Sequence, residues 1–172
     1  MRKTFSLPVA ATAAGGGVTP PPADTVDNIE HSVRFNSADS AYMSRTPSSA
    51  GNRKTWTWSG WVKRGALNGV RQTIFGCTVS GADYSILEFD ANDSLKYYET
   101  GAPGGTSLVT TAVYRDPSAW YHIVLAVDTD AGNSADRQKL YVNGVEVTDF
   151  STSNSIAQGY STQINNTQVQ DI

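Results

Sequence analysis

The sequence between Trp120 and Val147, WYHIVLAVDTDAGNSADRQKLYVNGVEV, decides the fold. Its first eight residues, 120–127, are rich in β-branched and aromatic side chains, and apolar residues occupy both alternating sets of positions. A strand with no polar face is expected to be covered on both sides, as the inner strand of a sandwich is. The polar segment 128–139, with its Gly-Asn-Ser breaker, predicts an exposed loop before the next strand.

The second half of this stretch carries the strongest hairpin signal in the chain. Asn143-Gly144 stands between Leu-Tyr-Val and Val-Glu-Val triplets. A two-residue type I′ turn requires positive φ at both central positions, which asparagine and glycine tolerate best. The pattern therefore predicts strand, tight turn and strand over 140–147. In the preceding strand, we expect His122 to be a hydrogen-bonded interior residue rather than a metal ligand.

Further β patterns precede this stretch. The segment 55–63, TWTWSGWVK, places Trp56, Trp58 and Val62 on one face of a predicted strand. Alternating or β-rich segments predict additional strands at 70–79, 84–90, 95–98 and 107–113, and a hairpin over 31–43.

Three of these motifs carry a family resemblance: Val33-Arg34-Phe35-Asn36, the 55–63 strand, and the Trp-x-His strand with its Leu-Tyr-Val-Asn-Gly hairpin. Together, and in this order, they resemble the laminin-G-like, concanavalin-A-like jelly-roll family over about 31–150. The amino-acid sequence of residues 37–63 is similar to versions of this domain in tail-fibre and other virion proteins of marine bacteriophages. The fold alone assigns no activity, because it hosts lectins, glycanases and passive spacers.

The resemblance implies an all-β fold, a two-sheet antiparallel jelly-roll sandwich, over 31–172. It implies core positions for Trp56 and Trp58, although an aromatic row is also typical of sugar-stacking platforms. It further implies a short strand at 164–166, followed by a closing strand that this chain lacks. A missing closing strand exposes a sheet edge, so we expect either that the chain continues or that another subunit covers the edge.

Composition narrows the function classes. At 172 residues the chain has room for one domain and a tail. A net charge of −3 with scattered basic residues argues against a nucleic-acid partner. The single cysteine, Cys77, has no internal disulfide partner and is expected to be a buried strand residue. No apolar run approaches the ~20 residues that a membrane span requires.

Residues 1–30 differ in composition from the rest. They contain a triple glycine and Pro20-Pro21-Pro22, which predict an extended arm or linker that is flexible and then stiff. We expect this arm to anchor the domain to other virion proteins, using Phe5, Leu7 and the three prolines. The alternative is a secretory signal cleaved after Ala14, although its apolar part is short and interrupted.

The segment 84–90, YSILEFD, is the place to look for catalysis. Concanavalin-A-like glycanases carry Glu-x-Asp-x-Glu on one strand, whereas here Glu88 and Asp90 are followed by Asn92, with Asp93 out of register. Because the third carboxyl is missing, we expect no enzyme activity, and glycanase is the most remote alternative. The ordinary interpretation is a solvated strand face with Glu88 or Asp90 paired to Lys96. A ligand-contacting face would use Glu88, Asp90, Lys96 and Tyr98.

An oxygen-rich loop offers one metal hypothesis. The loop after 127 contains Asp128, Asp130, Asn133 and Asp136, and some laminin-G-like domains bind calcium at the sandwich rim. The spacing does not match an EF-hand, because no bidentate glutamate closes it. The sequence predicts no other cofactor.

The sequence therefore favours a non-catalytic structural or host-recognition module of a bacteriophage virion, such as a tail fibre, that binds host surface glycans through repeated copies. The resemblance suggests a homo-oligomer, and a trimer is typical of fibres. The competing class is a secreted cellular carbohydrate-binding or adhesion module.

Overall fold

The computed structural model describes residues 32–103 and 105–172, so the predicted arm and its anchoring residues lie outside the described residues. Residues 35–172 pack together as one unit, and the fold is that of this unit. None of the described residues belongs to a helix long and apolar enough to cross a membrane.

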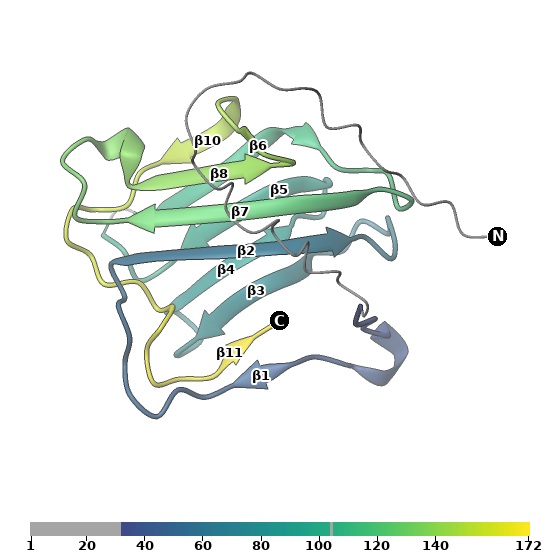
Figure 1. Cartoon of the computed structure of the whole chain (residues 1–172), viewed down its shortest axis with the longest axis horizontal. Helices are drawn as coiled ribbons and strands as arrows, with labels where there is room; N and C mark the ends of the chain where they lie inside the picture. Colours follow the sequence, from purple (N-terminus) through teal and green to yellow (C-terminus); the bar gives the residue numbers. More distant parts are fainter. Residues whose placement is uncertain (1–31, 104) are drawn as a thin grey trace, which may run out of the picture. The chain divides into compact units, whose positions relative to one another are not determined.

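Two antiparallel sheets face each other (Figure 1). The seven-stranded sheet has the order β1-β11-β3-β4-β5-β6-β10, and the four-stranded sheet has the order β2-β7-β8-β9. This architecture confirms the all-β sandwich. The seven strands are β1 (Ser44–Arg45), β11 (Gln170–Asp171), β3 (Gln72–Thr78), β4 (Tyr84–Phe89), β5 (Ser94–Glu99), β6 (Thr106–Val113) and β10 (Phe150–Asn154). The other four are β2 (Thr55–Lys63), β7 (Trp120–Asp128), β8 (Gln138–Val142) and β9 (Val145–Glu146), with short 3-10 helices η1 (Ser37–Asp39) and η2 (Ser134–Asp136).

The core lies between the sheets, where alternate residues of each strand meet. Ile123 and Leu125 of β7 are fully buried against Leu87 and Phe89 of β4 and their neighbours. Trp56 is buried, and its indole Nε1 donates to Thr162 Oγ1 at 2.9 Å. Trp58 is half-buried and stacks on Phe75 with ring centroids 6.0 Å apart. The core assignment of both tryptophans is confirmed.

The expected coverage of β7 on both sides is wrong. Its second face lies on the outside of the four-stranded sheet, and Trp120 there is 47% exposed. His122 shares this outer face, half-buried, with its Nε2 3.0 Å from Ser59 Oγ. The hydrogen bond was expected, but the interior position was not, because apolar content alone does not reveal how many layers a sandwich has.

Of two predicted hairpins and one predicted short strand, the structure confirms one hairpin, and the other two predictions are wrong. Asn143 and Gly144 have φ of 52° and 80°, which confirms the 140–147 hairpin. The hairpin over 31–43 is wrong for the described residues 32–43, because 37–39 form η1 and β1 instead pairs with β11 from the other end of the chain. The strand at 164–166 is also wrong, since Asn165 turns the chain with φ of 62° while Ile164 is buried in the core.

Candidate binding face

The outer face of the seven-stranded sheet carries the residues that sequence analysis singled out. Strand register places Glu88 of β4 opposite Lys96 of β5, and Thr73 of β3 on the other side of Glu88. The adjacent row contains Ile86 opposite Tyr98. Because successive side chains of a strand alternate between faces, these residues point away from the core, while Leu87 and Phe89 point into it.

Four charged side chains form a compact cluster on this face. Arg71 Nε lies 3.7 Å from Glu88 Oε1 and 3.2 Å from Asp90 Oδ1. Lys96 Nζ lies 3.8 Å from Glu88 Oε1 and 3.6 Å from Asp90 Oδ2. Tyr98 completes the group, because Lys96 Nζ stands 4.4 Å above its ring and its hydroxyl donates to Glu88 Oε2 at 3.5 Å.

This cluster partly matches the sequence interpretation. The structure brings Glu88, Asp90, Lys96 and Tyr98 together and shows the expected pairing with Lys96. The interpretation of a solvated face is wrong for Glu88, which is only 2% exposed beneath the two cations. Arg71 was not predicted, because it lies in the loop before β3 and only the β3–β4 register brings it near Glu88.

Glu88 is an unusual carboxylate. Among the described residues, its Oε1 has no hydrogen-bond partner, since both cations stand too far away for a hydrogen bond. Burial raises the pKa of Glu88, although Lys96 and Arg71 oppose the shift. Burial and the Glu88 charge raise the pKa of Tyr98 to about 12. A buried acceptor without a donor costs stability, and the charges of Arg71 and Lys96 beside Glu88 Oε1 offset part of that cost.

Asp90 behaves differently from Glu88. Burial disfavours its charge, but the Ala91 amide, Lys96 and Arg71 together lower its pKa. Two neighbouring carboxyl groups, one with a raised pKa and one with a lowered pKa, are typical of glycosidases. Here, however, the third position is Asn92, whose side-chain oxygen accepts from Ser94 in the turn. The two carboxyls are also engaged by the same two cations.

Two hollows flank the cluster. One, of about 480 Å³, lies beside Ile86 and Thr73 and is walled by Phe35 and Tyr42, with Asp171 at its edge. The other, of about 350 Å³, lies beside Lys96 and Tyr98 and includes Ser107 and Asn154. The outer face of this sheet therefore combines recesses, charged groups and an aromatic ring.

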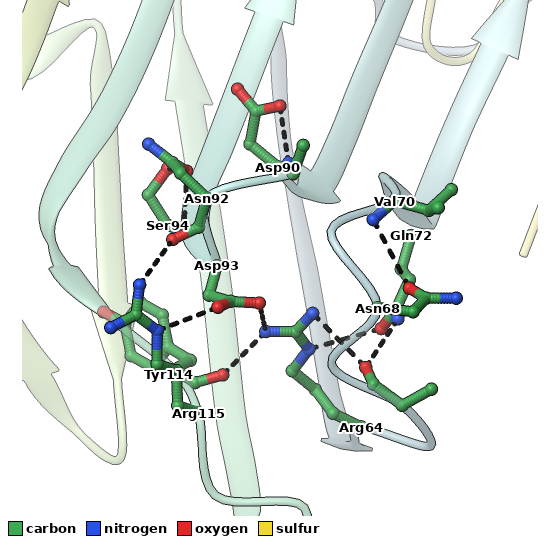
Figure 2. A network of polar contacts seen from close by, with 12 residues as sticks. Arg64, Asn68, Val70, Gln72, Asp90, Asn92, Asp93, Ser94, Tyr114 and Arg115 are labelled. Carbon is green, nitrogen blue, oxygen red and sulfur yellow. Dashed lines mark hydrogen bonds and ion pairs between the residues drawn. The ribbon is translucent and has the colours of Figure 1, made fainter.

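A buried arginine organises the neighbouring end of the sandwich (Figure 2). Arg64 Nη1 donates to Asp93 Oδ1 at 2.7 Å and to the Tyr114 carbonyl at 2.8 Å, and its Nε donates to Gln72 Oε1 at 3.2 Å. Its guanidinium also stands 4.8 Å above the Phe89 ring. Arg64 is only 3% exposed, so it supports the β4–β5 turn and is not available to a ligand.

Glu99 is a second buried acid that the sequence did not reveal. It faces the core from β5, fully buried, and accepts hydrogen bonds from the Ser85 and Tyr97 hydroxyls and from the Gln163 amide. Burial nevertheless raises its pKa above the ordinary value of 4.5. Its hydrogen bond with the Gln163 amide ties the chain at Gln163 to the sheet.

We expect Glu99→Gln to flatten the pH dependence of stability. Because native Glu99 holds its proton more tightly than the unfolded chain does, the free energy of unfolding of the wild type falls as pH rises from about 4.5 through the raised pKa. The amide cannot ionise, and it can donate to the Ser85 and Tyr97 hydroxyls. Urea titrations at several pH values should show the difference between variant and wild type growing in the variant's favour with pH. Parallel curves would contradict the assignment.

The predicted calcium residues are each held by a different partner. Asp128 accepts from Thr55 Oγ1, Asp130 pairs with Lys54 at 3.2 Å, and Asp136 pairs with Lys139 at 3.0 Å. Asn133 caps η2 by accepting from the Ala135 amide. Within residues 32–103 and 105–172, no three His, Cys, Asp or Glu side chains are grouped as a metal site. Calcium binding at this loop stays a prediction.

Several solved structures are similar to this chain. The Ruminococcus gnavus IT-sialidase CBM40 has a TM-score of 0.50 at 15% identity, covering 69% of this chain and 64% of that one. The same domain bound to alpha2,3 sialyllactose gives 0.49 at 15%, covering 68% and 62%. The heptameric SAP-like pentraxin of Limulus polyphemus gives 0.48 at 12%, covering 76% and 55%. The chain thus spans less than two thirds of each.

Sequence comparison gives the family directly. No curated protein matches the chain significantly. Residues 36–170 match the laminin-G family described as the Concanavalin A-like lectin/glucanases superfamily. With the sandwich described above, this match shows that the chain belongs to the concanavalin A-like lectin/glucanase superfamily.

Proposed function

We propose that this protein is a non-catalytic carbohydrate-binding module that serves host recognition in a bacteriophage virion. The observation that carries the binding role is the cluster of Arg71, Glu88, Asp90, Lys96 and Tyr98 on the outer face of the seven-stranded sheet. It offers charged hydrogen-bonding groups and an aromatic ring between two hollows, which is what a polyhydroxylated ligand requires.

The virion setting is supported by the likeness of residues 37–63 to phage fibre domains. In such a particle, the segment 1–30 would anchor the domain, and many copies would present the same face. Weak single sites then bind strongly to a repetitive cell surface. The fold is equally consistent with a secreted cellular adhesion module. Such a module would bind its ligand with the same outer face of the seven-stranded sheet.

Binding is tested by affinity electrophoresis of the full chain in gels containing soluble polysaccharides, followed by titration calorimetry with the one that retards it. We expect Arg71→Ala to lower the affinity about tenfold, about 1.4 kcal/mol. Arg71 is 60% exposed on its side chain, and Lys96 remains beside Glu88 when it is removed, so we expect the variant to fold. Lys96→Met should have a similar effect.

The matched control is Lys139→Ala, which removes a paired lysine from the opposite sheet. It should bind as the wild type does. If Arg71→Ala and Lys96→Met bind as tightly as the wild type while remaining folded by circular dichroism, the cluster is not the binding site.

The setting is tested separately by mass spectrometry of the native source. Peptides that include the segment 1–14 in sedimented phage particles would support the virion role. Peptides beginning after Ala14 in the culture medium, and absent from particles, would support the secreted alternative and overturn the virion role.

A further inference from the structure

Residues of one row line up across the outer face of the seven-stranded sheet. Register pairs Asp171 of β11 with Gly76 of β3, Gly76 with Ile86, Ile86 with Tyr98, and Tyr98 with Ser107. Asn154 of β10 then stands opposite Ser107. Because neighbouring strands lie about 4.8 Å apart, the row from β11 to β10 spans roughly 24 Å.

The two hollows lie along this row, on either side of its centre. Asp171, Gly76 and Ile86 line the larger one, and Tyr98, Ser107 and Asn154 line the smaller one. Gly76 keeps the floor of the larger hollow low, since a Cβ there would stand 3.0 Å from the Ser85 carbonyl and 3.1 Å from Ile86. The charged cluster borders the row in the middle, where Lys96 stands over Tyr98.

The charges along the row favour an uncharged ligand. Arg71 and Lys96 are already paired with Glu88 and Asp90, so the four formal charges cancel. Asp171, at the edge of the larger hollow, adds a carboxylate to this row, so an acidic ligand would bring further negative charge to it.

We infer that the ligand is a neutral, linear glycan that lies across the strands, with separate sugar rings in the two hollows. This inference rests on the proposed function and adds to it the shape and charge of the ligand. A single terminal sugar would fill one hollow and leave the other half of the row unused. An internal segment of several rings would use the whole row.

The test begins with affinity electrophoresis in a panel of neutral polymers (laminarin, xylan, mannan, dextran) and acidic polymers (alginate, polygalacturonate, hyaluronate, polysialic acid). Fragments of the retarding polymer, from two rings to six, are then titrated into the full chain by calorimetry. We expect retardation by a neutral polymer and an affinity at least about tenfold higher for six rings than for two, because each further ring adds contacts.

Two variants probe the ends of the row independently. Tyr42→Ala opens the wall of the larger hollow, and Tyr42 is 69% exposed, so the fold tolerates the change. Ser107→Trp fills the smaller hollow. Each should lower the affinity for six-ring fragments about tenfold, while Thr57→Trp, on the outer face of β2, should leave it unchanged.

The outcomes separate the two levels of the proposal. Binding only to acidic polymers, equal affinity for two and six rings, or sensitivity to only one of the two variants would overturn the extended neutral ligand while leaving carbohydrate binding intact. Retardation by none of the polymers would overturn both.

Discussion

Replacing Arg64 by leucine is expected to lower the free energy of unfolding by about 3 kcal/mol. The variant removes donors from Asp93, the Tyr114 carbonyl and Gln72, and it removes the cation that packs on Phe89. A buried polar group that loses its partner pays the full desolvation cost. The cost falls at the lower end of the range for broken buried ion pairs, because Arg115 still reaches Asp93 at 2.8 Å. Urea denaturation followed by tryptophan fluorescence measures it.

Arg115→Leu is the matched control. Arg115 binds the same carboxylate but is 62% exposed, and exposed ion pairs contribute at most about 1 kcal/mol. Equal losses in the two variants would mean that burial of Arg64 does not matter, and a loss below about 1 kcal/mol for Arg64→Leu would contradict its role as a support of the β4–β5 turn.

Trp56→Ala is expected to destabilise the protein by about 3–5 kcal/mol, the range for emptying a large aromatic site in a core. Trp56 packs edge-on against Tyr97 with ring centroids 6.2 Å apart, and its indole nitrogen binds Thr162. The variant therefore creates a cavity and also frees the segment around Thr162. The same urea titration applies, with the m-value compared to verify that unfolding remains two-state.

Trp61→Ala distinguishes core from surface within one strand. Trp61 lies on the opposite face of β2, 57% exposed, and contacts His122 by stacking at 5.0 Å. We expect a loss of about 1 kcal/mol or less. If Trp61→Ala were as damaging as Trp56→Ala, the assignment of the two faces of β2 would be wrong.

The parts of the fold that the sequence predicted are those set by local chemistry. The Asn143-Gly144 turn requires positive φ at two successive residues, and few other pairs tolerate this. Strands with strong apolar alternation, such as 55–63, were found with their bounds. By contrast, β10 (Phe150–Asn154) consists almost wholly of Ser, Thr and Asn, so its sequence gives no strand signal. It forms because it can pair with the otherwise unpaired edge of β6.

In the candidate site, too, some residues follow from local sequence patterns and others do not. Glu88 and Asp90 share a face by the period of a strand, and the turn at 92–93 brings Lys96 and Tyr98 beside them. Asp171 and Tyr42 join the same face only through pairing between distant strands, which no local pattern encodes. Arg71 joins it through the register between β3 and β4. Burial of Arg64, written next to Lys63 as an ordinary basic pair, likewise depends on what surrounds it.

The most direct test of the central claim is a chemical-shift map of the full chain with six-ring fragments of the polymer that retards it. If the outer face of the seven-stranded sheet binds glycans, amide signals of Ile86, Tyr98 and Ser107 should shift, while those of Trp61 and His122 on the other sheet stay in place. Shifts confined to the four-stranded sheet, or to the loop 129–137, would contradict the account.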